Sequence, residues 1–309
     1  MYTVISNGLK PLYYLLRLTG LLNFKLDTTG NFIDMNSYLL AVTVINATLT
    51  IVCTYFCTRT MLEFRSYNSL TVHLLSISTI VGGISIIVTD IIRFVNRRKI
   101  SNIWSDIFLL NDIYADEKVK LNYNLIQYTG YIIIWVQFLI RILTSNLVAK
   151  DDAWTTVFDL WIIILVISYL RNSVTTVEFV ILRLVVASYF NNFVILLQRI
   201  NAATRHLKRN KLFSLYFNLC RLSKNVDCIA SPQIITKLFE SFLALNILIY
   251  HVISLTLYLP EDRSTLTGII VFYMILDSCV TIAYVILPVH LSIKNVSVLY
   301  IMLKQLYFK

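Results

Sequence analysis

Histidine and cysteine are the side chains best suited to bind a metal or to act as nucleophiles, and this 309-residue chain has few of either. The histidines are not spaced with cysteines or carboxylates as metal ligands are, and no H-E-x-x-H, phosphate-binding Gly-rich loop or G-x-S-x-G turn is present. We therefore expect no enzyme, with no catalytic residue, no metal site and no cofactor. The residues considered are His73, His206, His251, His290, Cys53, Cys57, Cys220, Cys228 and Cys279.

Charged side chains within apolar segments are stronger candidates, because each is costly in a membrane unless it is paired or hydrated. Asp159 lies near the start of one apolar segment, and Arg141 closes the preceding segment on the same side, so we expect the two to pair. Such a pair either contacts a ligand or only fastens two helices together. Asp277 falls near the middle of another segment and is expected to face a wet cavity or a polar side chain.

Aromatic and polar residues accompany these charges at one end of the apolar segments. Rings mixed with a few polar groups suit a pocket for a small amphiphilic ligand, although Trp and Tyr also gather at membrane interfaces where no ligand binds. The candidate ligand-binding residues are Trp135, Gln137, Arg141, Phe158, Asp159, Tyr250, His251, Tyr273 and Asp277.

The elements that must position these residues are membrane-spanning helices. Hydrophobic residues make up 57% of the chain and charged residues only 14%, against roughly 25% charged in a soluble domain. About 20 apolar residues cross a bilayer as a helix. The sequence predicts an all-α, polytopic helical bundle with one membrane domain over 1–309 and six recognisable spans, at about 35–58, 66–89, 121–140, 154–182, 241–260 and 266–290.

The net charge of +10 indicates how these spans are oriented. Cytoplasmic loops carry the excess of Lys and Arg. With the N-terminus inside, 22 of the 27 basic residues fall on inner segments and 5 on outer loops. We therefore expect a cytoplasmic N-terminus and a lipid bilayer as the partner of the chain, and no nucleic acid.

A long connection, residues 183–237, separates the fourth span from the fifth and is expected to form cytoplasmic helices. Two apolar stripes at helical spacing need partners, which are either other parts of the chain and neighbouring subunits or the surface of the inner leaflet. Ser231 and Pro232 are expected to begin the helix of the fifth span, as N-cap and first residue. The stripe residues, expected to form a subunit anchor, are Phe190, Phe193, Leu197, Leu215, Leu219 and Leu222.

A shorter apolar face precedes the first span. Leu9, Leu12 and Leu16 share one side of a predicted helix that Gly20 ends. This helix is expected either to lie on the inner leaflet or to pack under the bundle.

Local motifs resemble those of the insect gustatory receptors, which are related to the insect odorant receptors. Lys10-Pro11-Leu12 with Leu18-Thr19-Gly20 looks like the family's opening, and Ile103-Trp104 to Asp112 looks like its second inner loop. Residues between Tyr216 and Tyr250 look like its approach to the fifth span. The family's seventh span, with its Thr-Tyr, apolar run and Gln-Phe, is missing after Leu291, so a truncated isoform or an incomplete gene model is expected.

The resemblance implies a chemosensory receptor subunit of the plasma membrane that detects a small-molecule tastant. It also implies a ligand-gated cation channel assembled as a homo- or heterotetramer of related subunits, with a seven-span family fold. The alternatives are a non-conducting modulatory subunit, a polytopic transporter and a G-protein-coupled receptor, the last of which would require an extracellular N-terminus.

Overall fold

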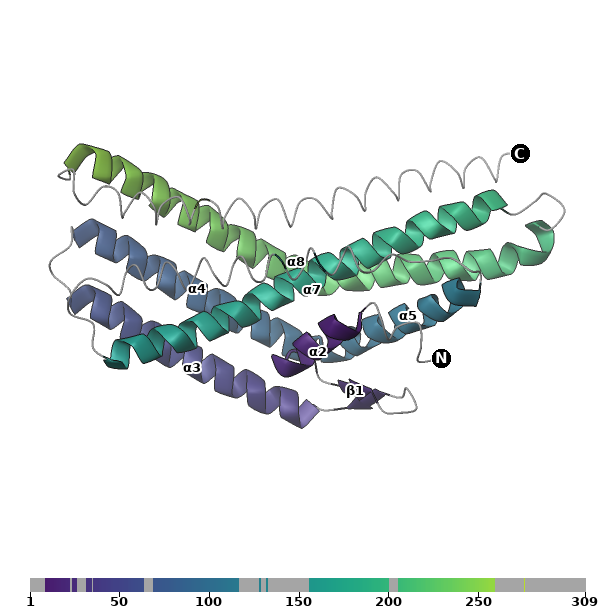
Figure 1. Ribbon diagram of the computed structural model, residues 1–309, viewed down its shortest axis with the longest axis horizontal. Helices are drawn as coiled ribbons and strands as arrows, with labels where there is room; N and C mark the ends of the chain where they lie inside the picture. Colours follow the sequence, from purple (N-terminus) through teal and green to yellow (C-terminus); the bar gives the residue numbers. More distant parts are fainter. Residues whose placement is uncertain are drawn as a thin grey trace.

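The computed structural model describes residues 9–22, 24–26, 32–34, 36–63, 69–116, 156–199 and 205–258, together with the single helical residues 128, 132 and 275. Within these ranges the chain forms six helices and one two-stranded hairpin (Figure 1). The helices are α2 (Lys10–Leu18), α3 (Asn36–Glu63), α4 (Ser69–Val95), α5 (Arg97–Asp116), α7 (Thr156–Arg199) and α8 (Arg205–Tyr258), and the strands are β1 (Phe24–Leu26) and β2 (Phe32–Asp34).

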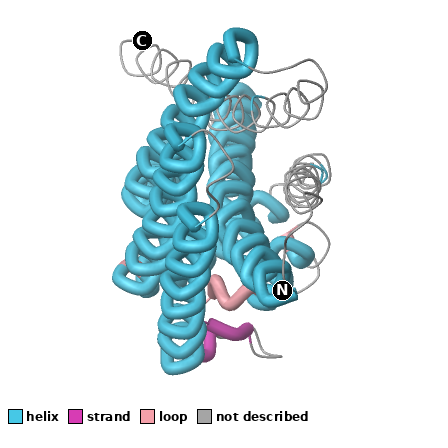
Figure 2. The backbone as a smooth tube through the Cα atoms, turned by 90° about the vertical axis from the view of Figure 1, so that its left-hand side faces the viewer, coloured by secondary structure: helices cyan, strands magenta, loops and turns pink. Residues whose placement is uncertain are grey.

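The predicted all-α class is confirmed, with one small addition. β1 and β2 pair as antiparallel strands, with Phe24 opposite Asp34 and Leu26 opposite Phe32. This hairpin lies at the lower edge of the molecule in both views, beside the beginning of α3 (Figure 1, Figure 2). Its three-residue strands are too short to give an alternating pattern that distinguishes them from a loop, and the sequence analysis did not predict them.

α3 and α4 form an antiparallel pair at one end of the molecule. Gly83 of α4 permits their close approach, since a Cβ atom there would lie 2.5 Å from Thr54 Oγ1 of α3. Small residues mark such contacts between membrane helices. Large apolar side chains of both helices nevertheless stay exposed, among them Ile45 (59%) and Ile84 (54%), as expected of surfaces that face lipid.

The chain turns by 69° between α4 and α5, at Asn96. The turn is held by local bonds. The backbone N–H of Asn96 and its side-chain Nδ2 both donate to the Ile92 carbonyl, at 3.0 and 2.9 Å. Arg97 donates to the Phe94 carbonyl at 3.0 Å and lies over the Phe94 ring. α5 therefore leaves α4 in a fixed direction.

α7 and α8 are 44 and 54 residues long, and α7 runs diagonally along the molecule in Figure 1. Neither contains glycine, and their one proline is Pro232. The predicted helix start at Ser231 is wrong, because α8 continues through Pro232. The Ser231 hydroxyl donates to the Asp227 carbonyl one turn earlier and does not cap a new helix.

The main core lies where α2, α5, the second half of α7 and the first half of α8 meet. Trp104, Tyr114 and Tyr189 are fully buried there. The Tyr114 and Tyr189 rings stack with centroids 5.3 Å apart, and the Tyr114 hydroxyl donates to the Tyr189 carbonyl at 2.9 Å. Arg183 of α7 also forms an ion pair with Asp227 of α8. The apolar faces of this layer are therefore covered by other parts of the same chain.

Two described segments are apolar and long enough to cross a membrane, Ser37–Arg59 in α3 and Ser173–Leu197 in α7, with the bent pair Thr79–Val95 and Arg97–Leu110 as a third if it is one span. Their surroundings differ. Only 22% of the most apolar window in α3 is buried, against 72% in α7. Protein packing accounts for the apolar composition of Ser173–Leu197. The six predicted span boundaries stay predictions, and nearly all of 121–140 and 266–290 lies outside the described residues.

Candidate functional site

The predicted ligand-binding residues are described only in part. Phe158 and Asp159 lie in the first turn of α7, and Tyr250 and His251 lie in the last third of α8. Tyr250 is 37% exposed. The other five, Trp135, Gln137, Arg141, Tyr273 and Asp277, lie outside the described residues. The predicted pocket and the pair between Arg141 and Asp159 therefore stay predictions.

A different set of charges meets inside the described structure. We call Asp90, Arg93, Arg171 and Glu178 the buried ion-pair network. Asp90 and Arg93 come from α4 and Arg171 and Glu178 from α7, and their side chains are between 3 and 9% exposed. The network brings together two cations and two anions, so its formal charge is zero.

Two direct ion pairs hold the network together. Arg171 Nη1 lies 2.6 Å from Asp90 Oδ2, and Arg93 Nη1 lies 2.5 Å from Glu178 Oε2. Asn46 of α3 donates to the same Asp90 oxygen at 2.6 Å, so a third helix contributes. Charge-assisted hydrogen bonds of this length are among the stronger contacts in proteins.

The end of α2 presents backbone carbonyls to this network. Gly20 has φ +67°, the left-handed conformation that ends many helices. Its N–H donates to the Arg17 carbonyl at 3.1 Å, and the Leu21 N–H donates to the Leu16 carbonyl at 2.8 Å. These two bonds form a Schellman motif. A Cβ at Gly20 would also lie 2.5 Å from Val42 Cγ1 of α3, so glycine is needed for two reasons.

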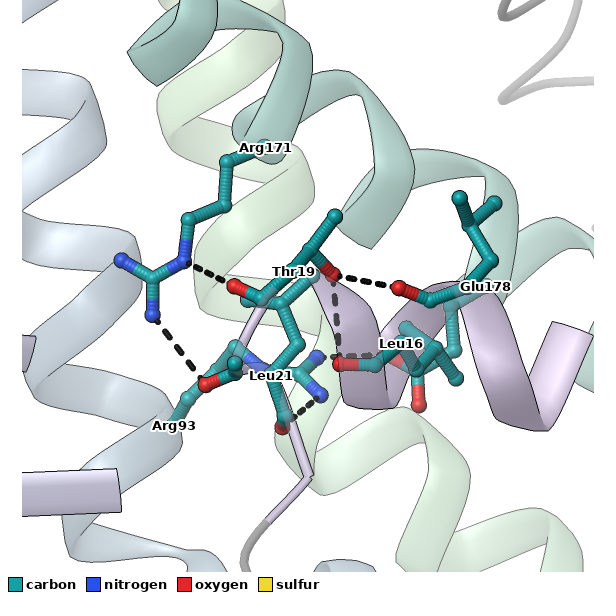
Figure 3. A network of polar contacts seen from close by, with 8 residues as sticks. Leu16, Thr19, Leu21, Arg93, Arg171 and Glu178 are labelled. Atoms are coloured by element: carbon teal, nitrogen blue, oxygen red, sulfur yellow. Dashed lines mark hydrogen bonds and ion pairs between the residues drawn. The ribbon is translucent and has the colours of Figure 1, made fainter. Parts of the chain in front are cut away.

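Both arginines reach from the network to that segment (Figure 3). Arg171 Nε donates to the Thr19 carbonyl at 3.0 Å. Arg93 Nη2 donates to the Leu21 carbonyl at 2.8 Å. Each arginine thus satisfies a carboxylate from the neighbouring long helix and a carbonyl just after α2. The network fastens the N-terminal segment to α3, α4 and α7 in one place.

The network was not predicted from the sequence, where Arg93 and Arg171 are two of the 22 basic residues placed on inner segments. One signal was available: Asp90 and Arg93 are three residues apart and Arg171 and Glu178 seven apart, so each helix carries opposite charges on one face. That spacing does not show that α4 packs against α7.

The predicted anchor residues pack within the chain itself. All six are no more than 8% exposed and belong to its core. Other parts of the chain were one of the partners expected for these stripes, and the subunit anchor stays a prediction. A contact between subunits in this layer would fall on other residues, such as Phe217, which is 66% exposed. The six residues are Phe190, Phe193, Leu197, Leu215, Leu219 and Leu222.

Two positions were expected for the N-terminal helix, on the inner leaflet or under the bundle, and the structure has the second. Leu9, Leu12 and Leu16 are at most 1% exposed and pack in the main core. α2 therefore lies under the bundle, and its apolar face does not contact lipid.

At one end of the molecule the described chain has long apolar helices with exposed side chains, and at the other end it has a helical layer with its own core. This arrangement is that of a helical membrane protein. A comparison with protein families identifies it further: the model of the 7tm chemosensory receptors matches residues 9–306. The chain belongs to this family. The match supports the recognised resemblance to the insect gustatory and odorant receptors. A search of curated proteins finds no match.

Proposed function

We propose that the chain is a subunit of a ligand-gated cation channel of the gustatory class, which detects a small-molecule tastant at the plasma membrane. The observation that carries the proposal is the extent of the family match, from residue 9 to residue 306. Assembly as a homo- or heterotetramer with related receptor subunits belongs to the same proposal, because a central pore needs several copies around an axis.

The buried ion-pair network supports this proposal. A channel must transmit a change among its spans to the layer that joins its subunits, and coupling of this kind needs elements that move together. Arg171 and Arg93 tie α4, α7 and the N-terminal segment to one another at the boundary between the exposed apolar helices and the main core.

The test is electrical recording from cells that express the full chain, alone and together with a related subunit. Sugars, alkaloids and amphiphilic acids are applied in turn to the outside. We expect an inward cation current that appears with one ligand class and is absent from untransfected cells. Asp159→Asn and Asp277→Asn are expected to shift the concentration for half-maximal current without lowering surface expression.

Three outcomes would overturn the channel assignment. Flux of a substrate without ligand-gated current indicates a transporter. Surface expression without current, but with a changed ligand response of a co-expressed subunit, indicates a modulatory subunit. Surface expression with neither effect across the panel also contradicts the proposal.

A further inference from the structure

Three exposed cations lie along the outer side of the contact between α5 and α8, which run side by side in Figure 1. Lys99 Nζ of α5 donates to Cys228 Sγ of α8 at 3.5 Å. Seven residues further along α5, Asp106 forms an ion pair with Arg221, which lies seven residues earlier in α8, so the helices are antiparallel. Lys224 falls between these two contacts. We call Lys99, Lys224 and Arg221 the cation row, and all three are exposed.

The positive charge of the cation row is only partly balanced. Asp106 pairs with Arg221, and Asp227, the other carboxylate beside this part of α8, already pairs with an arginine of α7. Neither Lys99 nor Lys224 has a carboxylate partner among the residues that the structure describes. Two lysines therefore remain available to an anion within a row about 10 Å long, the rise of seven helical residues.

The same face of α8 becomes apolar directly beyond the cation row. Three large side chains follow Cys228 by 7, 11 and 14 residues, a spacing that keeps them on its side of the helix. They are 66%, 57% and 63% exposed, in the order Ile235, Phe239 and Phe242. α4, which packs against α8, likewise ends at an exposed apolar residue, Val95, four residues before Lys99. On both helices, exposed apolar side chains give way to cations.

This change of character identifies the kind of molecule that fits the surface. Cations alone would suit any anion, and apolar side chains alone would suit any apolar partner. The two together, in sequence along one helix face, match a molecule with a negatively charged head and long apolar chains. Basic residues next to a membrane span attract acidic lipids for this reason, and the attraction grows with each Lys or Arg near the membrane surface.

We propose that the contact between α5 and α8 binds an acidic phospholipid. Lys99 and Lys224 hold its head group, and its acyl chains extend along α8 over Ile235 and Phe239. In the expected orientation of the chain this lipid belongs to the inner leaflet, which is the leaflet rich in acidic lipids. The site shares no residue with the buried ion-pair network or with the predicted tastant pocket. It stands whether or not the chain conducts.

Native mass spectrometry of the full chain, purified in a neutral detergent, tests the proposal. Phosphatidylserine and phosphatidylcholine with identical acyl chains are added in turn, and glycerophosphoserine supplies the acidic head group without the chains. We expect phosphatidylserine to bind about tenfold more tightly than phosphatidylcholine, and glycerophosphoserine to give no adduct at the same concentrations. Equal binding of the two phospholipids would overturn the proposal. Binding of glycerophosphoserine as tight as that of phosphatidylserine would also overturn it, because the occupant would then be a soluble anion.

Lys99→Gln and Lys224→Gln locate the site. Each is expected to weaken the binding of phosphatidylserine about fivefold and to leave the binding of phosphatidylcholine unchanged, since one cation near the membrane surface contributes about that factor. Lys211→Gln is the matched control, because Lys211 is also exposed on α8 but lies 13 residues, or about 20 Å, from Lys224. Equal weakening by Lys211→Gln and Lys224→Gln, or no weakening by Lys99→Gln and Lys224→Gln, would overturn the site.

The thiol of Cys228 reports the position of the head group. It contacts Lys99 and precedes the apolar stripe by two helical turns, so a bound head group is expected to cover it. N-ethylmaleimide should label Cys228 several-fold more slowly in nanodiscs that contain phosphatidylserine than in phosphatidylcholine alone, as measured on the peptide that contains it. Lys224→Gln, which keeps the contact between Lys99 and the thiol, is expected to remove this protection. Equal labelling rates of the wild-type protein in the two membranes would overturn the assigned position.

Discussion

The four charges of the buried ion-pair network depend on one another. Burial of a lone charge is costly, and the cost is offset only where the charge has a partner and its remaining hydrogen-bonding groups are satisfied. Arg171 and Arg93 each meet a carboxylate and a backbone carbonyl, so the segment after α2 is part of what makes their burial possible. Removal of one carboxylate leaves an arginine buried without its ion pair.

Glu178→Gln is therefore expected to destabilise the protein by about 3–5 kcal/mol. The control is Asp106→Asn, which breaks the pair between Asp106 and Arg221. Arg221 is 57% exposed in that pair, so the expected loss is only about 0–1 kcal/mol. The two losses of stability are measured by thermal unfolding in detergent, with size-exclusion chromatography after heating to follow the folded protein. Equal losses for the two variants would contradict the role assigned to the network.

Residue-level prediction from the sequence succeeded where the signal is local. Gly20 was expected to end the first helix, and its positive φ confirms that role. The partners of Arg93 and Arg171 could not be predicted in the same way. Their pairing depends on the register between α4 and α7, which are about 80 residues apart in the chain, and a single sequence does not contain that register.

At the scale of elements, α8 is the largest difference between expectation and structure. Ser-Pro is typical of a helix start, because proline lacks the N–H that is unsatisfied there. The same two residues are tolerated inside a helix when packing holds both flanking turns. Ile229 and Ala230 are buried in the main core just before Pro232, and Ser241 is buried two to three turns after it. Tertiary packing thus overrides the local signal.

Pro232→Ala restores an N–H that can donate to the carbonyl of Cys228 and removes the steric conflict of the ring. We expect slower amide hydrogen exchange over residues 229–236 and a gain in stability of about 1–3 kcal/mol. Exchange measured by mass spectrometry checks this. Thr236→Val is the control: it removes the bond from the Thr236 hydroxyl to the Pro232 carbonyl without restoring a donor. Unchanged exchange in Pro232→Ala would show that α8 is not weakened at this point.

At the scale of the whole molecule, two kinds of apolar helix share one chain. α3 carries exposed apolar side chains, whereas the second half of α7 is equally apolar but enclosed by protein. Composition predicted the helical membrane class correctly, because both kinds of helix raise the hydrophobic fraction of the chain. Composition could not separate lipid-facing from core segments, since that distinction depends on which surfaces the other helices cover.

The predicted orientation can be tested with a native residue. Cys228 is exposed and lies in the connection expected to be cytoplasmic. A membrane-impermeant maleimide is expected to label it only after the cells are permeabilised, and an epitope at the N-terminus is expected to need the same treatment. Cys228→Ser is the control for labelling at other cysteines. Labelling of Cys228 in intact cells would reverse the orientation.

The turn at Asn96 has a mechanical consequence. α4 and α5 meet at 69° through local bonds, with Arg93 next to the turn. The far end of α5 is held as well, because Tyr114 stacks on Tyr189 of α7 and donates to its carbonyl at 2.9 Å. α5 is thus fastened at both ends, and a tilt of α4 is expected to press on the main core instead of swinging α5 freely.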